Sequence, residues 1–388
     1  MALDLREVPS FGVFPGQVIG VRGVAPTGSR LIVSEVFCDG APPRAQMKLA
    51  NAVALHRARA AGGPVRVWAA CGPYTSVADV KYEPLQLLLA EALQARPPPD
   101  VLVLQGPFVD LDHPMSKAGA PELKDDATGK VAERYTFRGV WDIVLASIGL
   151  YLQQDALARL QVVLMPASSD AVTEPVFPQW PLQRKDFEDA LARGDLQESV
   201  LRRITVLPNP ATFVVGDLVF GSTSADVAFH LTAEDCSKQA AGAAAPDRLS
   251  QLARYVLEQR CYYPLYPAGG AAQGSASAEG ALQLEVTRVW NCGMNVRPDV
   301  LLLPTKIGRP CARPVGVGGA GVDRDATVVV NPGFVAKGRA AGTFAKIAIF
   351  AGAAPPGASP GSDEADAPDY VFSGAAERVL VEMCSLTA

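Results

Sequence analysis

Histidine, paired cysteine and long apolar runs are scarce in this chain of 388 residues. It has three histidines, none beyond position 230, and its seven cysteines include no C-x-x-C pair. Scattered cysteines in odd number argue against a disulfide framework or a zinc knuckle and favour buried thiols in a reducing compartment. No run of about 18 apolar residues occurs, and the first ten residues lack the apolar segment of a secretory signal. The sequence therefore predicts a soluble intracellular protein.

An excess of positive charge is also missing. The formal net charge is -5, so no global basic field would draw the chain onto nucleic acid. A DNA-binding module remains one hypothesis, but residues 11–38 lack the interleaved aromatic and basic side chains that single-strand binding uses. Hydrophobic residues make up 49% of the chain and charged residues 19%, which is enough to fill the cores of two domains.

The chain divides into three parts by pattern. Residues 11–38 alternate apolar and polar side chains in two runs around Pro26-Thr27-Gly28, which predicts a β-hairpin and, over residues 1–40, part of an OB-type barrel. Residues 41–64 are rich in Ala and Arg and indicate a linker with a short helix. The second domain is expected over residues 65–388, with disordered loops near its Ala/Gly/Ser-rich segments 240–246, 268–280 and 352–369.

Strands and helices alternate from residue 65 onward. Apolar strands are expected at 65–71, 101–106 and 161–168, with helices at 82–96 and about 138–159 between them. This order predicts an α/β sheet with helices on its faces, in which the carboxyl ends of the three strands meet at one edge. Further strands are expected at 211–224, 299–304, 327–333 and 343–350, and a helix at 250–261.

The loops after these three strands read CGPYTS, GPFVDLDH and PASSDAV. Their positions resemble those of calcineurin-type metallophosphoesterases, whose loops carry D-x-H, G-D-x-x-D and G-N-H-D. In this chain Gly72 and Tyr74 occupy the positions of the Asp and His of D-x-H. Pro107 occupies the position of the bridging Asp, and Ser168-Ser169 replaces the Asn-His pair. Of the family's ligands, only Asp110 and Asp170 remain. The candidate degenerate loop residues are Gly72, Pro73, Tyr74, Gly106, Pro107, Phe108, Asp110, Ser168, Ser169 and Asp170.

A dinuclear metal site needs several anionic or imidazole ligands, and Gly, Pro and Ser supply none. We therefore predict no catalytic residue, no metal and no cofactor. We interpret Asp112 and His113 as solvated loop residues, Asp110 as a cap of its turn and His230 as a packed or hydrogen-bonded side chain. The alternative is an active metal-dependent phosphoesterase or nuclease with remodelled ligands.

Several stretches in order resemble the B subunits of eukaryotic DNA polymerase alpha, from about residue 9 to 350. They include FPGQVIGVRG, ACGPYT, LQGPFVD, GSTSADVAFHL, QRCYYPLYP and VVVNPGFVAKGRAAGTFAKI. The words most specific to this family are CGPYT, YYPLYP and NPG-x-x-x-KG-x-x-GTFA. The family motif positions are Tyr262, Tyr263, Pro264, Asn331, Pro332, Gly333, Lys337, Gly338, Gly342 and Thr343.

This resemblance implies an OB fold followed by an inactivated calcineurin-like phosphoesterase fold. It also implies a non-catalytic scaffold in the nucleus, which binds the C-terminal domain of the polymerase alpha catalytic subunit and tethers it to primase. Contact with DNA would be indirect. Members of the family carry a helical N-terminal domain, a linker and the front of the OB fold before FPGQ. The chain begins almost at that point, which suggests an N-terminally truncated form, through a gene model, an isoform or a genuine absence.

Overall fold

The computed structural model describes the chain except for residues 39, 61, 120, 125–130, 241, 243–246, 270–281, 318–324, 353–368, 372–373 and 388. Most of the three loops that the sequence predicts to be disordered, 240–246, 268–280 and 352–369, lies outside the described residues. Within the described part, no helix combines the length and the apolarity that a bilayer crossing needs.

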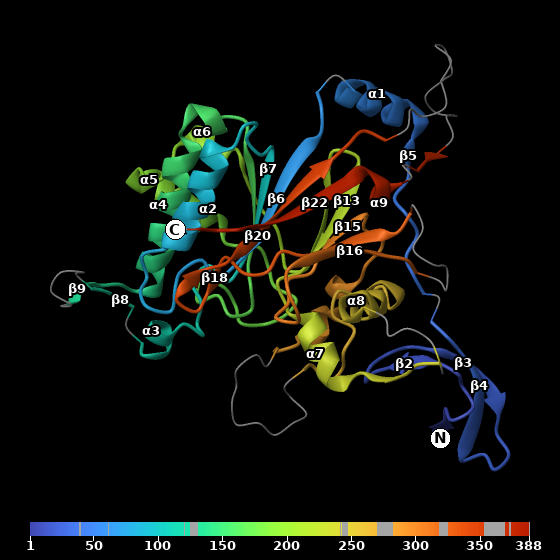
Figure 1. The fold of residues 1–388 in the computed structure, drawn as a ribbon. Helices are drawn as coiled ribbons and strands as arrows, with labels where there is room; N and C mark the ends of the chain where they lie inside the picture. The colour runs from blue at the N-terminus through green and yellow to red at the C-terminus, as the bar shows by residue number, and fades with distance from the viewer. Residues whose placement is uncertain are drawn as a thin grey trace.

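A six-stranded mixed sheet forms the centre of the molecule (Figure 1). Neighbouring strands β11, β10, β7 and β6 are parallel, whereas β20 is antiparallel to both β6 and β22. The strands in order are β11 (Ile204–Val206), β10 (Gln161–Met165), β7 (Val101–Gln105), β6 (Val65–Cys71), β20 (Thr343–Ile349) and β22 (Val379–Ser385). The strands predicted at 65–71, 101–106, 161–168 and 343–350 are thereby confirmed.

A second sheet of five strands accounts for the strand-rich second half of the chain. Strands β13, β15 and β17 are parallel neighbours, and the two outer strands are antiparallel to them. The order is β12 (Ala211–Val215), β13 (Leu218–Ser222), β15 (Val300–Leu302), β17 (Thr327–Asn331) and β16 (Cys311–Val315). The predicted strand at 211–224 is a hairpin of β12 and β13, turned at Gly216-Asp217.

The two sheets pack face to face, which corrects the prediction of helices on both faces of one sheet. Val67 and Val103 of the first sheet share a buried cluster with Phe220, Val300 and Val330 of the second. Four helices cover the outer faces: α2 (Glu83–Gln94) and α4 (Phe137–Leu152) on the first sheet, α7 (Val227–Glu234) and α8 (Arg248–Glu258) on the second. A strand buried between a helix layer and another sheet is apolar on both sides, so its sequence does not reveal which layer covers it.

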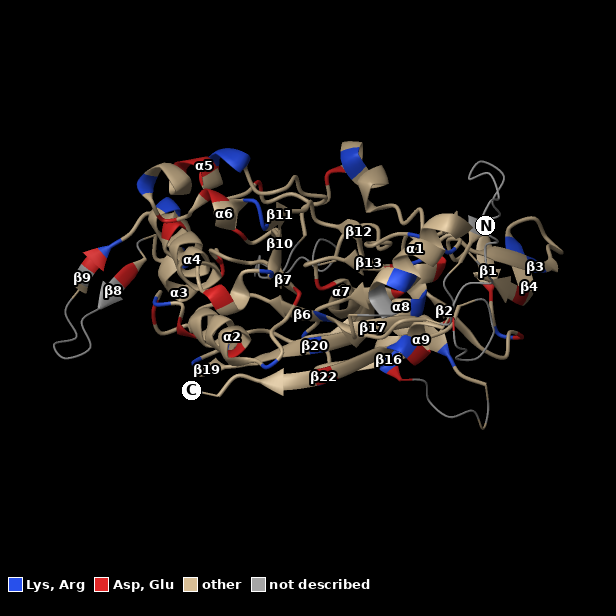
Figure 2. Cartoon of the chain, turned by 90° about the horizontal axis from the view of Figure 1, so that it is seen from above, with Lys and Arg blue, Asp and Glu red and all other residues tan. Residues whose placement is uncertain are grey.

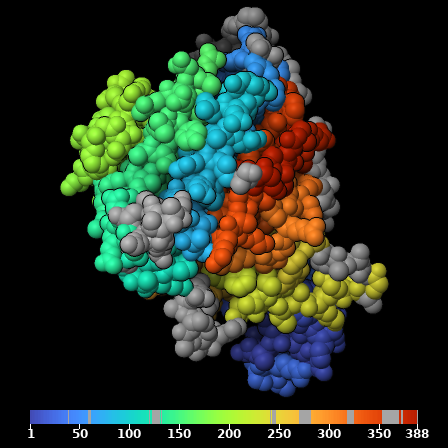
Figure 3. Space-filling model, turned by 60° about the vertical axis from the view of Figure 1, so that its left-hand side comes forward, coloured from blue at the N-terminus to red at the C-terminus, as the bar shows by residue number. Residues whose placement is uncertain are grey.

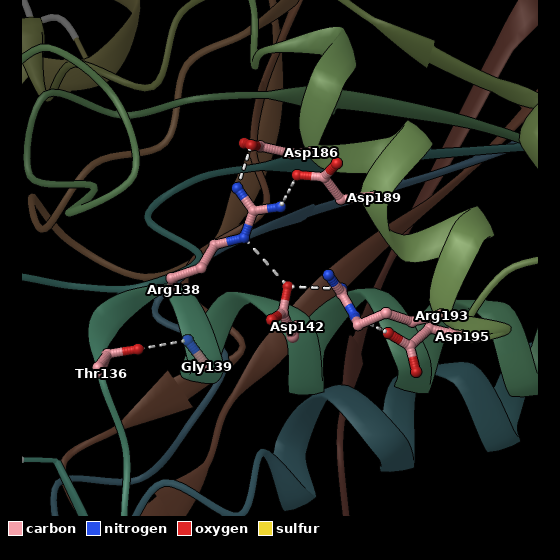
Figure 4. Close-up of polar contacts among 8 residues, drawn as sticks. All are labelled: Thr136, Arg138, Gly139, Asp142, Asp186, Asp189, Arg193 and Asp195. Carbon is pink, nitrogen blue, oxygen red and sulfur yellow. Dashed lines mark hydrogen bonds and ion pairs between the residues drawn. The ribbon is translucent and has the colours of Figure 1, made fainter.

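Helix α4 shows how the outer layer is built. The Thr136 hydroxyl accepts a hydrogen bond from the Gly139 amide at 3.0 Å and so caps the helix start. Its buried side chains recur at helical spacing and face the sheet: Val140, Trp141, Val144, Leu145, Ile148 and Leu152. On its other side, Arg138 contacts Asp186 and Asp189 of α5 (Arg184–Arg193), and the contacts extend through Asp142 to Arg193 and Asp195 (Figure 4). An ion-pair network therefore joins α4 to α5.

The N-terminal strands sit at the end of the molecule where α7 and α8 lie (Figures 1 and 3). They form a three-stranded sheet of β1 (Ala2–Asp4), β4 (Arg30–Phe37) and β3 (Gly20–Val24). The predicted hairpin is confirmed for β3 and β4. The prediction that it begins near residue 11 is wrong, because β2 (Phe11–Val13) pairs with β14 (Cys236–Lys238). A turn at Gly16, with φ of +89°, separates β2 from the hairpin.

The chain then runs along the edge of the five-stranded sheet, where Arg44 forms ion pairs with Asp299 at 2.8 Å and Asp325 at 2.5 Å. The helix predicted within 41–64 is present as α1. The remaining elements are β5 (Met47–Lys48), α1 (Leu49–Ala60), α3 (Pro114–Lys117), β8 (Glu122–Lys124), β9 (Val131–Arg134), η1 (Asp155–Leu157), α6 (Glu198–Leu201), η2 (Val286–Cys292), β18 (Ala336–Lys337), β19 (Ala340–Ala341), β21 (Asp369–Tyr370) and α9 (Ala375–Arg378).

Acidic and basic residues are interspersed on the helices (Figure 2). Helix α5, for example, carries both signs: Arg184, Lys185 and Arg193 together with Asp186, Glu188 and Asp189. This helix therefore has no broad surface of one charge sign. The net charge of the whole chain, -5, likewise shows no excess of basic residues.

Candidate functional site

The three predicted loops start side by side at one edge of the six-stranded sheet. In the parallel register Cys71 lies beside Gln105, which lies beside Met165. The Gly72 amide donates to the Gln105 carbonyl at 2.8 Å, and the Gly106 amide to the Met165 carbonyl at 2.7 Å. The expected convergence of the strand ends is confirmed, and the loops leave them in close contact.

Two glycines allow these loops to approach one another. A Cβ atom at Gly72 would lie 2.1 Å from the Pro107 carbonyl oxygen. At Gly106 it would lie 2.6 Å from the Ala167 amide nitrogen and 2.3 Å from a carboxylate oxygen of Asp170. Neither position tolerates a side chain, so backbone and an aspartate already occupy the space beside these strand ends.

Aromatic side chains fill the interior of the loop cluster. Tyr74 and Phe108 are fully buried and stack with ring centroids 5.3 Å apart and planes inclined by 10°. Phe108 in turn contacts Trp141 of α4 at 5.5 Å. The Tyr74 hydroxyl lies 2.9 Å from the Gln105 carbonyl and 3.1 Å from that of Ala70, and burial raises its pKa well above the ordinary value. The prolines Pro73 and Pro107 are half-buried.

Asp170 is the only carboxylate of the cluster that is completely buried. Its oxygens accept hydrogen bonds from the amides of Phe108, Val109 and Ala167, the last two at 2.8 Å. Burial raises the pKa of Asp170 to about 7, against the effect of these three donors, which stabilise the charged form. The aspartate therefore joins two loops through the backbone.

Asp110 and Ser169 complete the junction of these two loops. Asp110 forms an isolated antiparallel bridge with Asp170, and the Leu111 amide donates to the Ser169 carbonyl at 2.8 Å. Asp110 accepts from the Asp112 amide at 3.0 Å, as expected for a turn cap, and burial raises its pKa. Ser168 and Ser169 are half-buried.

His113 does not lie in solvent, which corrects that prediction. Its side chain is buried, its Nε2 donates to the Ser76 carbonyl at 2.8 Å, and its Nδ1 accepts from the Met115 amide at 3.2 Å. The ring thereby caps α3 and fixes it to the loop that follows β6. Both nitrogens are engaged by the backbone, as in a structural histidine. Asp112 is exposed, as predicted.

Gln105 links the two sheets and was not singled out from the sequence. Its side chain is buried, and its Nε2 donates to the Ser222 hydroxyl and the Thr223 carbonyl, both at 2.9 Å. Ser222 ends β13, so this amide joins the edges of both sheets. The sequence could have indicated this residue, because Gln105 is the one polar residue of the otherwise aliphatic strand VLVLQ.

The NPG-x-x-x-KG-x-x-GT stretch packs on the loop CGPYT. The Val335 amide donates to the Cys71 carbonyl at 2.9 Å, and the Ala336 amide to that of Pro73 at 3.0 Å. Gly338, with φ of +62°, accepts from the Val77 amide. The neighbouring positions of the motif organise its turns: Asn331 accepts from the Thr305 and Gly333 amides, and Thr343 donates to the Pro332 carbonyl. Gly342 packs where a Cβ atom would meet the Phe334 carbonyl oxygen at 2.0 Å, and Lys337 is exposed.

The YYPLYP stretch lies at the other sheet, between α8 and the β12–β13 hairpin. The Tyr262 hydroxyl lies 2.6 Å from that of Thr212. The Tyr263 hydroxyl lies 2.7 Å from His230 Nδ1, which confirms His230 as a hydrogen-bonded residue. Both tyrosines and Pro264 are buried.

This arrangement suits rigid packing of loops. Among the residues that the structure describes, no three His, Cys, Asp or Glu side chains come together as metal ligands could. The polar atoms of the cluster are directed at backbone groups of neighbouring loops, and the space between them holds aromatic rings.

Two models of known protein families match this chain. Residues 67–309 match a family model described as the DNA polymerase alpha/epsilon B subunit, which covers more than half of the chain. The chain belongs to the family of DNA polymerase alpha/epsilon B subunits. Residues 1–39 match a second family model, the OB domain of the DNA polymerase alpha B subunit. The three-stranded N-terminal sheet is thus an OB-domain segment, and the mixed α/β part carries the motifs of the B subunits.

Individual relatives point to the same family. The chain is 29% identical over 345 residues to the DNA polymerase alpha B subunit of Mus musculus, an alignment that covers 89% of this chain and 48% of the relative. It is 26% identical over 348 residues to the B subunit of Schizosaccharomyces pombe, covering 89% and 53%. For Bos taurus the identity is 28% over 308 residues, covering 79% and 43%. The chain spans about half the length of the curated relatives it matches.

Proposed function

We propose that this chain is a non-catalytic accessory subunit of DNA polymerase alpha–primase. In this role it binds the C-terminal domain of the polymerase catalytic subunit and tethers it to primase for the initiation of DNA replication in the nucleus. The membership in the B-subunit family and the alpha-type OB match support an accessory role in replication. Primase and DNA would be reached through the complex.

The two face-to-face sheets with outer helices support a calcineurin-like phosphoesterase fold for residues 65–388. Residues 1–40 would then contribute part of the OB fold, and residues 41–64 the linker and helix between the two domains. In such a fold the reactive edge is the one where β6, β7 and β10 end.

The contacts of Asp170 support the non-catalytic assignment most directly. A carboxylate that ligates a metal directs its lone pairs at the cation, yet Asp170 accepts from three backbone amides of its own fold. The stacked rings of Tyr74 and Phe108 fill the interior of the loop cluster, which supports the same assignment. Phosphodiester hydrolysis by two metal ions requires open coordination positions, and this packing supports none.

A pull-down tests the proposal. The C-terminal domain of the polymerase alpha catalytic subunit, immobilised, should retain the purified chain through a moderate-salt wash. A bare resin and an unrelated OB-fold protein are the controls. If the resin retains no more of the chain than the controls do, the scaffold role is contradicted. A parallel titration with single-stranded DNA should give only weak binding that disappears with salt, because an acidic chain neutralises few phosphates.

A further inference from the structure

Cys261 and Cys292 come from distant parts of the chain and lie against each other. Cys261 follows α8, and Cys292 is the last residue of η2. The two segments pair over three residues: Cys261 bridges Gly293, the Tyr262 amide donates to the Cys292 carbonyl at 2.8 Å, and the Met294 amide to the Arg260 carbonyl at 2.6 Å. Cys292 precedes Gly293, the backbone partner of Cys261, and Cys261 packs against the buried cluster that contains Cys292. The backbone pairing holds the two cysteines side by side.

The two thiols differ in access. Cys261 is half-buried and lines a cavity of about 320 Å³, whereas Cys292 is fully buried beneath it. A small solute that enters the cavity therefore reaches Cys261 first.

The two thiols also differ in acidity. The Cys292 thiol and the Tyr263 amide hydrogen-bond to the Cys261 sulfur and lower its pKa. The same contact, together with burial, raises the pKa of Cys292. Because the thiolate is the reactive form, this lowered pKa and the access from the cavity both make Cys261 the nucleophile of the pair.

We propose that Cys261 and Cys292 form a reversible redox modification site, in which hydrogen peroxide converts the two thiols to a disulfide. The Cys261 thiolate attacks one peroxide oxygen and the O–O bond breaks. Cys261 becomes a sulfenic acid, and the departing hydroxide takes up the proton that the Cys261 thiol had released, which gives the first water. The Cys292 sulfur then attacks the Cys261 sulfur, the S–O bond breaks, and the second water leaves with the Cys292 proton. Two thiols are oxidised by two electrons and one peroxide is reduced to two waters. A dithiol reductant reverses the reaction by exchange.

The disulfide would join two walls of the cavity. One wall consists of residues near 259–266 and the other of Leu284, Val286 and Val289, with Gly16 and Val18 of the N-terminal segment beside them. Several of these side chains are exposed apolar groups, among them Val18 at 80% and Val286 at 58% of their maximal exposure. Covalent closure of the segment between the two cysteines restricts the unfolded chain, so the oxidised protein should melt at a higher temperature than the reduced one.

Peptide mapping of the intact chain tests the proposal. The protein is reduced, freed of reductant, exposed to a small excess of hydrogen peroxide, alkylated and digested with trypsin. Cleavage after Arg260, Arg288 and Lys306 separates the two cysteines into peptides 261–288 and 289–306. We expect these peptides to appear joined, with the loss of two hydrogens, and to separate again after reduction with dithiothreitol. In the same sample the melting temperature should rise on oxidation and return on reduction.

Matched variants assign the chemistry. Cys292→Ser should leave Cys261 as a sulfenic acid that dimedone traps, and Cys261→Ser should leave Cys292 unmodified. Cys236→Ser removes an exposed cysteine and should leave the joined peptides unchanged. The proposal is overturned if wild-type protein gives Cys261 sulfenic or sulfinic acid without the joined peptides, or if Cys261 pairs with another cysteine. This readout requires only wild-type protein, so a variant that fails to fold does not weaken it.

Discussion

The ring of Tyr74 stacks on the ring of Phe108, with 5.3 Å between their centroids, in the loops that follow β6 and β7. Both residues are fully buried, and each is tied to the other's loop: the Tyr74 hydroxyl contacts the Gln105 carbonyl, and the Tyr82 hydroxyl donates to the Phe108 carbonyl at 2.7 Å. The loops at this edge of the sheet enclose a small hydrophobic core.

Removal of the Phe108 ring should destabilise the fold. Phe108→Ala would leave a cavity between Tyr74 and Trp141, and loss of a buried phenylalanine costs about 3–5 kcal/mol. The free energy of unfolding from urea titration measures this. Phe229→Ala, at a side chain that is 50% exposed, is the control and should change it by less than about 1 kcal/mol. An unchanged urea midpoint for Phe108→Ala would show that the ring is not part of the core.

Asp170 should make stability depend on pH. Its pKa is about 7 in the folded chain and near the usual 3.8 in the unfolded chain, so between these values the folded state holds a proton that the unfolded state has lost. The free energy of unfolding of wild type should therefore fall, relative to that of Asp170→Asn, as pH rises from 4 to 7. The total change is on the order of a few kcal/mol.

The Asp170→Asn variant places an amide NH₂ against backbone donors, so it is less stable than wild type at every pH. The comparison therefore uses how the difference in unfolding free energy changes with pH. Asp112→Asn, in the same loop but exposed, is the matched control for a lost loop carboxylate. Unfolding curves for wild type and Asp170→Asn that keep a constant separation from pH 4 to 7 would be inconsistent with a raised pKa at this site.

No metal-dependent hydrolysis of a phosphodiester is expected. Mn²⁺, Mg²⁺ and Zn²⁺ should each leave the rate with bis-p-nitrophenyl phosphate at the level of the buffer blank, because Gly72, Pro107 and Ser169 supply no anionic or imidazole ligand. The Asp110→Ala variant distinguishes hydrolysis by this chain from hydrolysis by a contaminating enzyme. Turnover that the metal stimulates and that Asp110→Ala abolishes would establish an active site, whereas turnover equal in both proteins would identify a contaminant.

The ion-pair network of Figure 4 should stabilise the contact between α4 and α5. Asp186 is buried, and Arg138→Met would leave its carboxylate without this cation, at a cost of about 1–3 kcal/mol. Arg202→Met, which breaks an exposed pair with Glu198, is the control and should cost less than about 0.5 kcal/mol. Equal losses of unfolding free energy in the two variants would show that the network adds nothing beyond surface pairs.

The central strands could be predicted from the sequence because their pattern is local. A run such as VRVWAAC is apolar on both faces, which indicates a buried strand whatever its partner, and β6 has the predicted bounds. What the run could not show was whether helices or a second sheet cover its inner face. The pairing of β2 with Cys236–Lys238 was likewise hidden, because it depends on residues more than 200 positions apart.

For the loop cluster, too, the sequence predicted some features and not others. The lack of ligands at Gly72, Pro107 and Ser169 was readable from residue type alone. The burial of His113 was not, because its acceptor, the Ser76 carbonyl, belongs to another loop and is brought near only by the fold. For the same reason the sequence singled out Asp170 as a remnant but could not show that three amides surround it.

The scaffold role can be tested by co-expressing this chain with the catalytic subunit of DNA polymerase alpha, followed by size exclusion with light scattering at moderate salt. The proposal predicts one peak whose mass equals the sum of the two chains, with an interface above about 2,000 Å² that survives dilution. A catalytic subunit lacking its C-terminal domain should elute apart from the chain. Separate elution of the chain and the intact catalytic subunit, with both proteins folded by circular dichroism, would contradict the scaffold role.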